Sequence, residues 1–351
     1  MGASVAHARP LRDAGFTVMT LSNNHVLDGG YVGLEDTRTT LSGMGIGTAG
    51  AGDDLEGALR PYTTEIAGVR VAILGFASVF PKGYEARPTR PGLAPLRLTT
   101  AYLDPDDNFW EPGVRPVIST IPFPEDLERF HLAIAAAREV ADAVIVSMHW
   151  GSSSVLEGLM AYEFELARDA VDHGADAVLC THHHALRPIE WHRGRPIFYG
   201  LGALVHHFRD EVVTPQGRAS AVKKHGPMAL YRAPAEEFPL WPFAEESRQS
   251  MIVSLTLGRG ENPVRAAGFF PAQMMADGST TAMAPDDLRA RAVGDYVAKM
   301  TADHELATGF DLTDRDGWAY VRLTDPDSPN ADAPQWRTNS DKKRKDSSVL
   351  A

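Results

Sequence analysis

Apolar and polar positions follow two different rhythms along this chain. Short runs in which apolar residues are consecutive or alternate with polar ones predict strands, as at 69–76. Longer segments repeat apolar residues three and four apart, as at Phe130, Ile134 and Ala137, and predict helices. The predicted strands span 16–21, 46–48, 62–66, 69–76, 143–148, 177–180, 189–192, 196–199, 251–257, 264–270 and 318–323. The predicted helices span 33–44, 124–137, 162–173 and 286–302.

The order of these elements favours an α/β fold. Predicted hairpins over 62–76 and 189–199 alternate with helical crossovers, and this pattern favours a layered sandwich with mixed sheets over a strictly parallel sheet. The stretch after 80 is rich in proline and polar residues, and long loops of this kind usually serve a functional site. We therefore expect a single domain over 1–323, irregular insertions at 81–123 and 206–248, and a disordered tail at 324–351.

Composition and charge restrict the class of protein. The 351 residues are 44% hydrophobic and 23% charged, which is enough for a large core. A formal net charge of −12 argues against a nucleic-acid partner and against a polybasic membrane-binding surface. The single cysteine excludes an intramolecular disulfide framework. We find neither a signal peptide nor a run of roughly 20 apolar residues, so we expect a cytoplasmic protein without a membrane span.

Histidines follow three of the predicted apolar runs and are the candidate chemistry of this chain. His25 and His149 each stand after one run, and His182, His183 and His184 follow a third. Neutral imidazole is the commonest protein metal ligand, and α/β folds place their chemistry at strand ends. On an extended segment the first and third histidines of the triplet would share one face. A single histidine at a strand end is usually only packed or capped, but together the three positions predict one site built by three loops.

Other polar residues are weaker candidates. Arg187 and Arg195 suggest an anionic substrate, because guanidinium pairs well with carboxylate and phosphate. The second of them also fits an ordinary solvated hairpin turn. Asp28 fits either a residue that orients a histidine or a helix cap. We expect His131 and His173, both on predicted helices, to be surface residues.

Four sequence motifs resemble those of a known family. They read LSNNHVLD at 21–28, SMHWG at 147–151, THHH at 181–184 and RPIFY at 195–199. In this order and spacing they resemble the CapA, or poly-γ-glutamate capsule-synthesis, family of the calcineurin-like metallophosphoesterase superfamily. The resemblance runs from about residue 11 to residue 205, and weakly on to about 323. It implies a metallophosphoesterase-like α/β/β/α sandwich.

The resemblance also implies residue roles. Asn24, His149 and His182 correspond to ligands of one metal ion, and His184 corresponds to a ligand of a second. His25 matches the histidine that assists the leaving group or the oxyanion. The middle histidine of the triplet stands where the family usually has proline, so it receives no role.

Two family motifs do not appear in this sequence. The Gly-Asp and Asn-Leu-Glu motifs normally precede residue 15, so we interpret the chain as N-terminally shortened and lacking the usual first strands. Three ligands and an open position are typical of a catalytic zinc site. The sequence therefore favours one divalent ion, Mn, Zn or Fe, over two.

The resemblance leaves two kinds of function open. The first is a metal-dependent hydrolase, metallophosphatase-like, that acts on a small or polymeric anionic ester or amide in bacterial poly-γ-glutamate or capsule metabolism. The second is a non-catalytic capsule-biosynthesis or binding protein that has lost the two-metal centre. A shortened sandwich would expose sheet surface, which favours a homo-oligomer.

Overall fold

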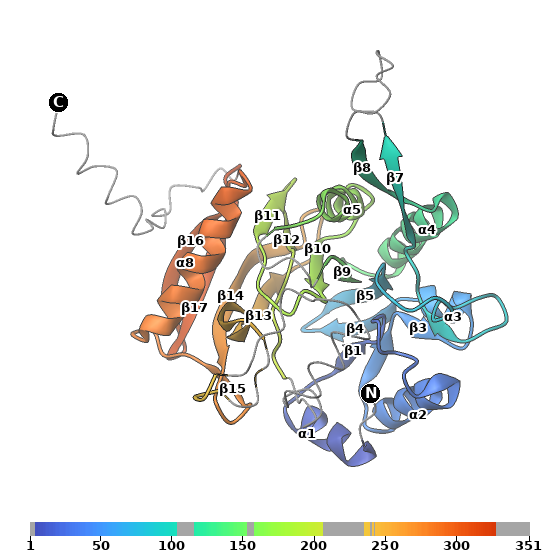
Figure 1. Ribbon diagram of the computed structural model, residues 1–351, viewed down its shortest axis with the longest axis horizontal. Coiled ribbons are helices and arrows are strands. Elements are labelled where there is room, and N and C mark those ends of the chain that lie inside the picture. The colour runs from blue at the N-terminus through green and yellow to red at the C-terminus, as the bar shows by residue number, and fades with distance from the viewer. Residues whose placement is uncertain are drawn as a thin grey trace. The chain divides into compact units, whose positions relative to one another are not determined.

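A computed structural model of the chain divides into two compact units (Figure 1). The first unit comprises residues 1–151 and 160–175, and the second comprises 152–159 and 176–351. The structure describes residues 4–103, 116–152, 158–205, 235–238, 241 and 243–327. In this described part of the chain, no helix is long and apolar enough to cross a membrane.

The first unit alternates helices with short strands. Strands β1 and β2 pair in parallel, as do β5 and β9, whereas β4 with β5, β3 with β6, and β7 with β8 are antiparallel. Its helices are η1 (Val5–His7), α1 (Ala8–Asp13), α2 (Gly30–Gly43), α3 (Leu55–Leu59), α4 (Pro124–Val140) and α5 (Ala161–Asp172). Its strands are β1 (Val18–Thr20), β2 (Gly47–Ala49), β3 (Ala51–Gly52), β4 (Tyr62–Ile66), β5 (Val69–Ala77), β6 (Gly92–Leu93), β7 (Leu98–Leu103), β8 (Val117–Pro122) and β9 (Ala143–His149).

A close backbone approach places β1 and β2 against β5. A side chain at Gly75 would come within 2.7 Å of the Ser22 hydroxyl and 3.2 Å of the Gly50 Cα atom. Glycine is therefore needed at this point of β5, because a Cβ atom would push the neighbouring backbone away. The contact holds the loop after β1, with its Asn-Asn-His sequence, beside β5, which runs parallel to β9.

The second unit is built mainly on antiparallel strands. β13, β14, β17 and β16 are neighbours in that order, β15 pairs with β14, β12 pairs in parallel with β10, and β11 is antiparallel to β12. Its elements are β10 (Ala177–Thr181), β11 (Ile189–His192), β12 (Arg195–Phe198), η2 (Glu245–Arg248), β13 (Gln249–Leu257), β14 (Val264–Met274), β15 (Thr280–Ala282), α8 (Leu288–Asp303), β16 (Gly309–Arg315) and β17 (Trp318–Thr324).

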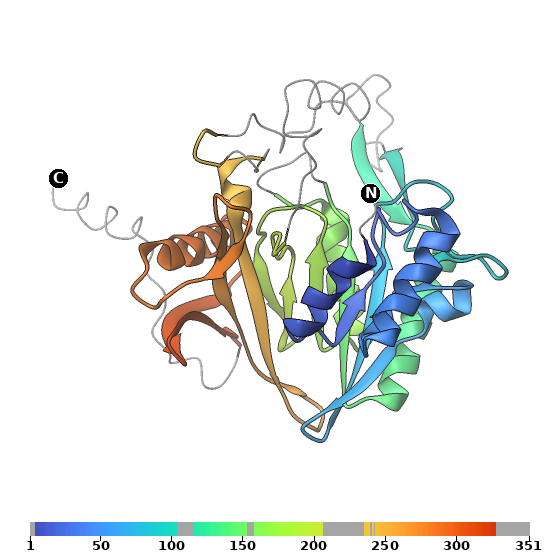
Figure 2. The ribbon, with the colours of Figure 1, turned by 90° about the horizontal axis from the view of Figure 1, so that it is seen from below.

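Helix α8 supplies much of the core of this unit. Its buried Val293 and Val297 join a cluster with Phe198, Phe269 and Val321. Figures 1 and 2 show α8 lying beside the long β13–β14 pair and the β16–β17 hairpin. Burying such side chains contributes roughly 1.5–3 kcal/mol each, so this cluster stabilises the whole unit.

The predicted α/β class with mixed sheets is confirmed, and most predicted elements are present. The helix predicted from residue 33 begins three residues earlier, at Gly30. The expectation for 81–123 is wrong in part, because this stretch contains β6 and the β7–β8 hairpin. The second predicted insertion lies largely outside the described residues, as does the predicted tail beyond residue 327. The single domain expected over 1–323 stays a prediction.

Buried charge organises the stretch after residue 80. The Glu85 carboxylate accepts hydrogen bonds from Arg87 Nη2 at 2.8 Å, Arg90 Nη2 at 3.0 Å and the Gly83 N–H at 2.8 Å. Its side chain is only 11% exposed. Burial raises the pKa of this carboxyl, but the hydrogen bonds and arginine charges lower it by more, to about 2.

Replacing Glu85 with glutamine is expected to make the free energy of unfolding depend less strongly on pH under acidic conditions. In the folded chain the carboxyl has a pKa of about 2, below its ordinary value of 4.5. Its contribution is therefore complete above about pH 4.5 and is lost as the pH falls towards 2. Glu85→Gln should lower the free energy of unfolding by about 2–3 kcal/mol at pH 7 and by much less near pH 3. Urea unfolding at a series of pH values measures both effects.

The exposed Glu56 offers the matched control. Glu56 lies on α3 and pairs at 3.0 Å with Arg60, which follows that helix, but the Glu56 side chain is 84% exposed. Glu56→Gln should change the free energy of unfolding by less than about 0.5 kcal/mol at every pH. Equal pH dependence in the Glu85→Gln variant and the unmodified chain would contradict the assignment.

Candidate metal centre

Asn24 and His149 meet in the first unit although they are 125 residues apart. Strand β9 ends at His149, and Asn24 stands in the loop that follows β1. His149 Nε2 donates a hydrogen bond to Asn24 Oδ1 at 3.1 Å. The first unit therefore brings together two of the side chains that the sequence predicts to bind one metal ion.

Local hydrogen bonds fix the loop that carries Asn24. The backbone N–H of His25 donates to Asn23 Oδ1 at 2.9 Å, which is the side-chain turn that asparagine favours. Thr20 at the end of β1 and Ser147 on β9 place their hydroxyls 3.3 Å apart. These contacts set the position of the loop relative to β9 before any ligand is considered.

His25 is held by Asp28. Its Nδ1–H donates to Asp28 Oδ2 at 2.9 Å, and the Tyr84 hydroxyl donates to Asp28 Oδ1 at 3.4 Å. Burial raises the pKa of Asp28, but hydrogen bonds, including that from His25, lower it by more, so the carboxyl stays ionised. Burial and the nearby Asp28 charge raise the pKa of Tyr84. The contact fixes the orientation of the half-exposed His25 ring.

The histidine triplet lies in the second unit and is a turn. β10 ends at Thr181, and His182 and His184 have φ angles of 99° and 54°. The expectation that these two histidines lie on an extended segment is therefore wrong. Their ring centroids are still 6.3 Å apart, while His183 is 1% exposed. Left-handed backbone at non-glycine residues costs about 1–3 kcal/mol and is concentrated at functional sites.

An aromatic side chain packs on one histidine of the triplet. The ring of His184 stacks on Phe243 with centroids 5.4 Å apart and planes 15° apart. This contact orients the imidazole and shields one of its faces from solvent. It restricts the rotamers of His184, as a preorganised ligand requires.

The two predicted substrate-binding arginines have structural partners. Arg187 is fully buried, and a side chain at Gly200 would come within 2.4 Å of its Cγ atom. Arg195 Nε donates to the buried Asp176 at 3.0 Å, and its Nη1 donates to Asn262 at 2.7 Å. The role of both arginines in substrate binding stays a prediction.

The donor atoms of the first unit suit a divalent ion. Tetrahedral ligand bonds of 2.0–2.2 Å put neighbouring donor atoms roughly 3.3–3.6 Å apart around one zinc ion. Asn24 Oδ1 and His149 Nε2 lie 3.1 Å apart in a hydrogen bond, so a small separation of the two side chains and loss of the Nε2 proton would let both bind one ion. Nitrogen and oxygen donors together suit Zn, Mn and Fe. The described contacts thus fit the ion that the resemblance implies.

The sequence interpretation missed one group of candidate ligands. His131 and His173 do not stand as separate surface residues: their rings stack on each other beside Asp169. The spacing of four between Asp169 and His173 was a readable signal, because residues four apart share a helix face. The partner from α4 could not be read from the sequence, because the contact joins positions 38 residues apart.

Comparisons with known proteins agree with the family that the sequence motifs resemble. A family model described as "Bacterial capsule synthesis protein PGA_cap" matches residues 2–207. The PGA biosynthesis protein CapA of Bacillus subtilis is 32% identical over 196 residues, which cover 56% of this chain and 44% of that protein. A probable polyglutamine synthesis accessory protein of Mycobacterium tuberculosis is 34% identical over 198 residues, 54% of this chain and 45% of that protein.

This chain spans less than half the length of those two curated relatives. Among solved structures, a hypothetical protein from Thermus thermophilus aligns with 80% of this chain and 79% of its own. That alignment has 15% sequence identity and a TM-score of 0.37.

Proposed function

The chain belongs to the PGA_cap family of bacterial capsule synthesis proteins, and on this basis we propose that it is a metal-dependent hydrolase of the metallophosphatase type. We favour one bound ion, Mn, Zn or Fe, with Asn24, His149 and His182 as its proposed ligands. His184 corresponds to a proposed ligand of a second metal position. The proposed substrate is an anionic ester or amide.

The contact between Asn24 and His149 carries the proposal. Two polar side chains from distant loops have their donor atoms 3.1 Å apart, and both are residue types that bind divalent ions. The loop that brings them together is fixed by its own turn and by the hydroxyl contact to β9. Preorganised donors of this kind are characteristic of metal sites.

The residues around the pair supply proton-transfer chemistry. A divalent ion, when bound, supplies Lewis acidity towards an ester oxygen and makes water more acidic. His25, oriented by the ionised Asp28, holds the proton on Nδ1 and can transfer a second one from Nε2 to a leaving group. Removing the aspartate would free the imidazole to rotate, so Asp28 acts as a positioning residue.

The names of the family and of its relatives support a proposed substrate class. The matched family is named for capsule synthesis, and two relatives are named for PGA or polyglutamine synthesis. We propose that the substrate is a glutamate-containing anionic polymer or a small anionic ester derived from capsule metabolism. With 46 acidic and 34 basic residues, the chain itself is acidic, so binding such a substrate requires the local positive charge of a metal ion or an arginine.

Metal-dependent hydrolysis is the test of the proposed function. Purified full chain should release product from a chromogenic phosphoester or from poly-γ-glutamate, lose this activity after chelation, and regain it when Mn²⁺ or Zn²⁺ is added. Chelated protein that keeps its full activity would contradict the metal mechanism.

The alternative function is a non-catalytic capsule-biosynthesis or binding protein that retains the fold. The names of the relatives support it, because one of them is called a polyglutamine synthesis accessory protein. A chain with this function would bind poly-γ-glutamate, take up no metal ion and hydrolyse none of these substrates. That result would support the non-catalytic function and overturn the hydrolase proposal.

A further inference from the structure

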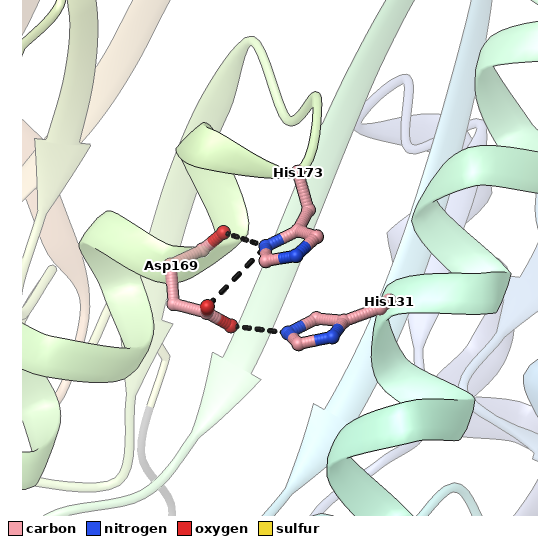
Figure 3. Close-up of side chains that lie close together, drawn as sticks. All are labelled: His131, Asp169 and His173. Atoms are coloured by element: carbon pink, nitrogen blue, oxygen red, sulfur yellow. Dashed lines mark hydrogen bonds and ion pairs between the residues drawn. The ribbon is translucent and has the colours of Figure 1, made fainter.

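Helices α4 and α5 of the first unit carry a second cluster of ligand-type side chains, none of which belongs to the proposed hydrolase site. His131 lies on α4, Asp169 lies on α5, and His173 follows at the end of α5 (Figure 3). His131 Nε2 donates to Asp169 Oδ2 at 2.6 Å. His173 Nδ1 donates to the Asp169 backbone carbonyl at 2.9 Å and lies 3.3 Å from Oδ1. Both imidazoles thus turn towards one carboxylate.

We propose that His131, Asp169 and His173 form a zinc-binding site that joins α4 to α5. One donor atom from each residue lies within 4.8 Å of the other two. Two imidazole nitrogens and one carboxylate oxygen are the donor set of many three-ligand zinc sites. Calcium and magnesium prefer oxygen donors, so this composition selects a transition metal.

The two helices present the ligands in a suitable arrangement. Asp169 and His173 are four residues apart, so they project from the same face of α5. His131 approaches from the neighbouring helix, which gives the third ligand a rigid support of its own. Their side chains are 26%, 29% and 42% exposed for His131, Asp169 and His173. An ion can therefore enter from solvent, and water can fill the fourth position.

The hydrogen-bonded arrangement of the two rings differs from the one that an ion would require. Figure 3 shows the rings of His131 and His173 stacked on each other. Their centroids are 3.5 Å apart and their planes are 7° apart. Nitrogen lone pairs lie in the ring plane, so parallel rings cannot both aim at one ion. Zinc binding therefore requires one ring to turn out of the stack, and each ligating imidazole carries its proton on the other nitrogen. Because all three side chains meet already, the backbone need not move.

The expected consequence is a cross-link between two helices that are 20 residues apart in sequence. Zinc that binds the folded chain and not the unfolded chain raises stability by linkage. At a free zinc concentration 100 times the dissociation constant, the unfolding temperature of a chain this size should rise by about 4 °C.

The test uses the full chain with His149→Ala and His182→Ala substitutions, so that zinc at the proposed catalytic centre does not contribute. After chelation, zinc titration followed by calorimetry should show about one equivalent bound. Adding His131→Gln should weaken binding at least about 100-fold and remove the zinc-dependent rise in unfolding temperature. Glutamine can still donate its amide hydrogen to Asp169, so the unfolding temperature without zinc should stay within about 1 °C.

The exposed His7 in the same unit provides the matched control. His7→Gln in the same background should leave both the affinity for zinc and the thermal shift unchanged. Zinc binding of equal strength in the His131→Gln chain, or no binding in the parent background, would overturn the proposal and leave the cluster as a hydrogen-bonded clamp between helices.

Discussion

Replacing His149 with alanine is expected to remove both the metal ion and the hydrolytic activity that we propose for this chain. The change deletes the Nε2 atom that lies 3.1 Å from Asn24 Oδ1. Loss of a residue that only supports a metal ligand typically costs 10–100-fold in metal affinity or activity. Loss of a ligand itself should therefore lower kcat/KM by more than about 100-fold. Metal analysis and steady-state kinetics on the same protein preparation measure the two effects together.

Two controls make the result for His149→Ala interpretable. Metal content should be measured in the His131→Gln background, because the proposed zinc site would otherwise add to the count. His7→Ala, which removes an exposed histidine of the same unit, should leave metal content and kcat/KM unchanged. Unaltered metal content and activity in the His149→Ala chain would exclude His149 as a ligand, provided that its unfolding temperature is also unaltered.

Sequence reasoning located the strands that the candidate histidines follow, but not the local geometry of these histidines. Runs of apolar residues located β9 and β10, so the histidines at their ends could be identified. Only the family resemblance implied that Asn24 and His149 lie close together. The spacing of apolar residues along the chain carries no information about distances between loops. The left-handed backbone at His182 and His184 also escaped prediction. A turn directly after a strand is determined by its surroundings, and the local sequence there lacks glycine.

Exposure explains why the β7–β8 hairpin was missed. Tyr102 and Ile118 face each other across the hairpin and are 70% and 64% exposed, and Leu103 and Val117 on the opposite face are 46% and 51% exposed. Alternation of apolar and polar residues arises when one face of a strand is buried and the other is solvated. These strands have no such contrast, so the periodicity that revealed β4 and β5 is missing from them.

Charged contacts, which leave no periodic pattern, hold this hairpin to α4. Arg97 stands just before β7, and Asp126 lies in the first turn of α4. Asp126 accepts hydrogen bonds from Arg97 Nε at 2.6 Å, Arg97 Nη2 at 2.8 Å and the Arg97 backbone N–H at 2.9 Å. Arg129 Nη1 adds a fourth at 3.1 Å. The carboxylate is fully buried, and its hydrogen bonds and charge raise the pKa of Arg97.

Replacing Asp126 with alanine is expected to be among the most destabilising single changes in the first unit. The substitution leaves the half-exposed Arg97 without its main partner, removes the acceptor for its backbone N–H, and deletes a negative charge at the N-terminus of α4. Breaking a buried pair from one side costs about 3–5 kcal/mol, a large fraction of the 5–15 kcal/mol by which domains are stable. Urea unfolding measures the loss.

The neighbouring Glu125 provides a control that separates the effect of burial from the effect of charge. Its carboxylate also pairs with Arg97, at 3.1 Å, but its side chain is 48% exposed, so Glu125→Ala should cost less than about 1 kcal/mol. Adding Arg97→Ala to Asp126→Ala should cost less than the sum of the two single changes, because the second substitution removes the charge that the first left unpaired. Strictly additive losses, or equal losses for Glu125→Ala and Asp126→Ala, would show that the buried pair does not anchor β7 to α4.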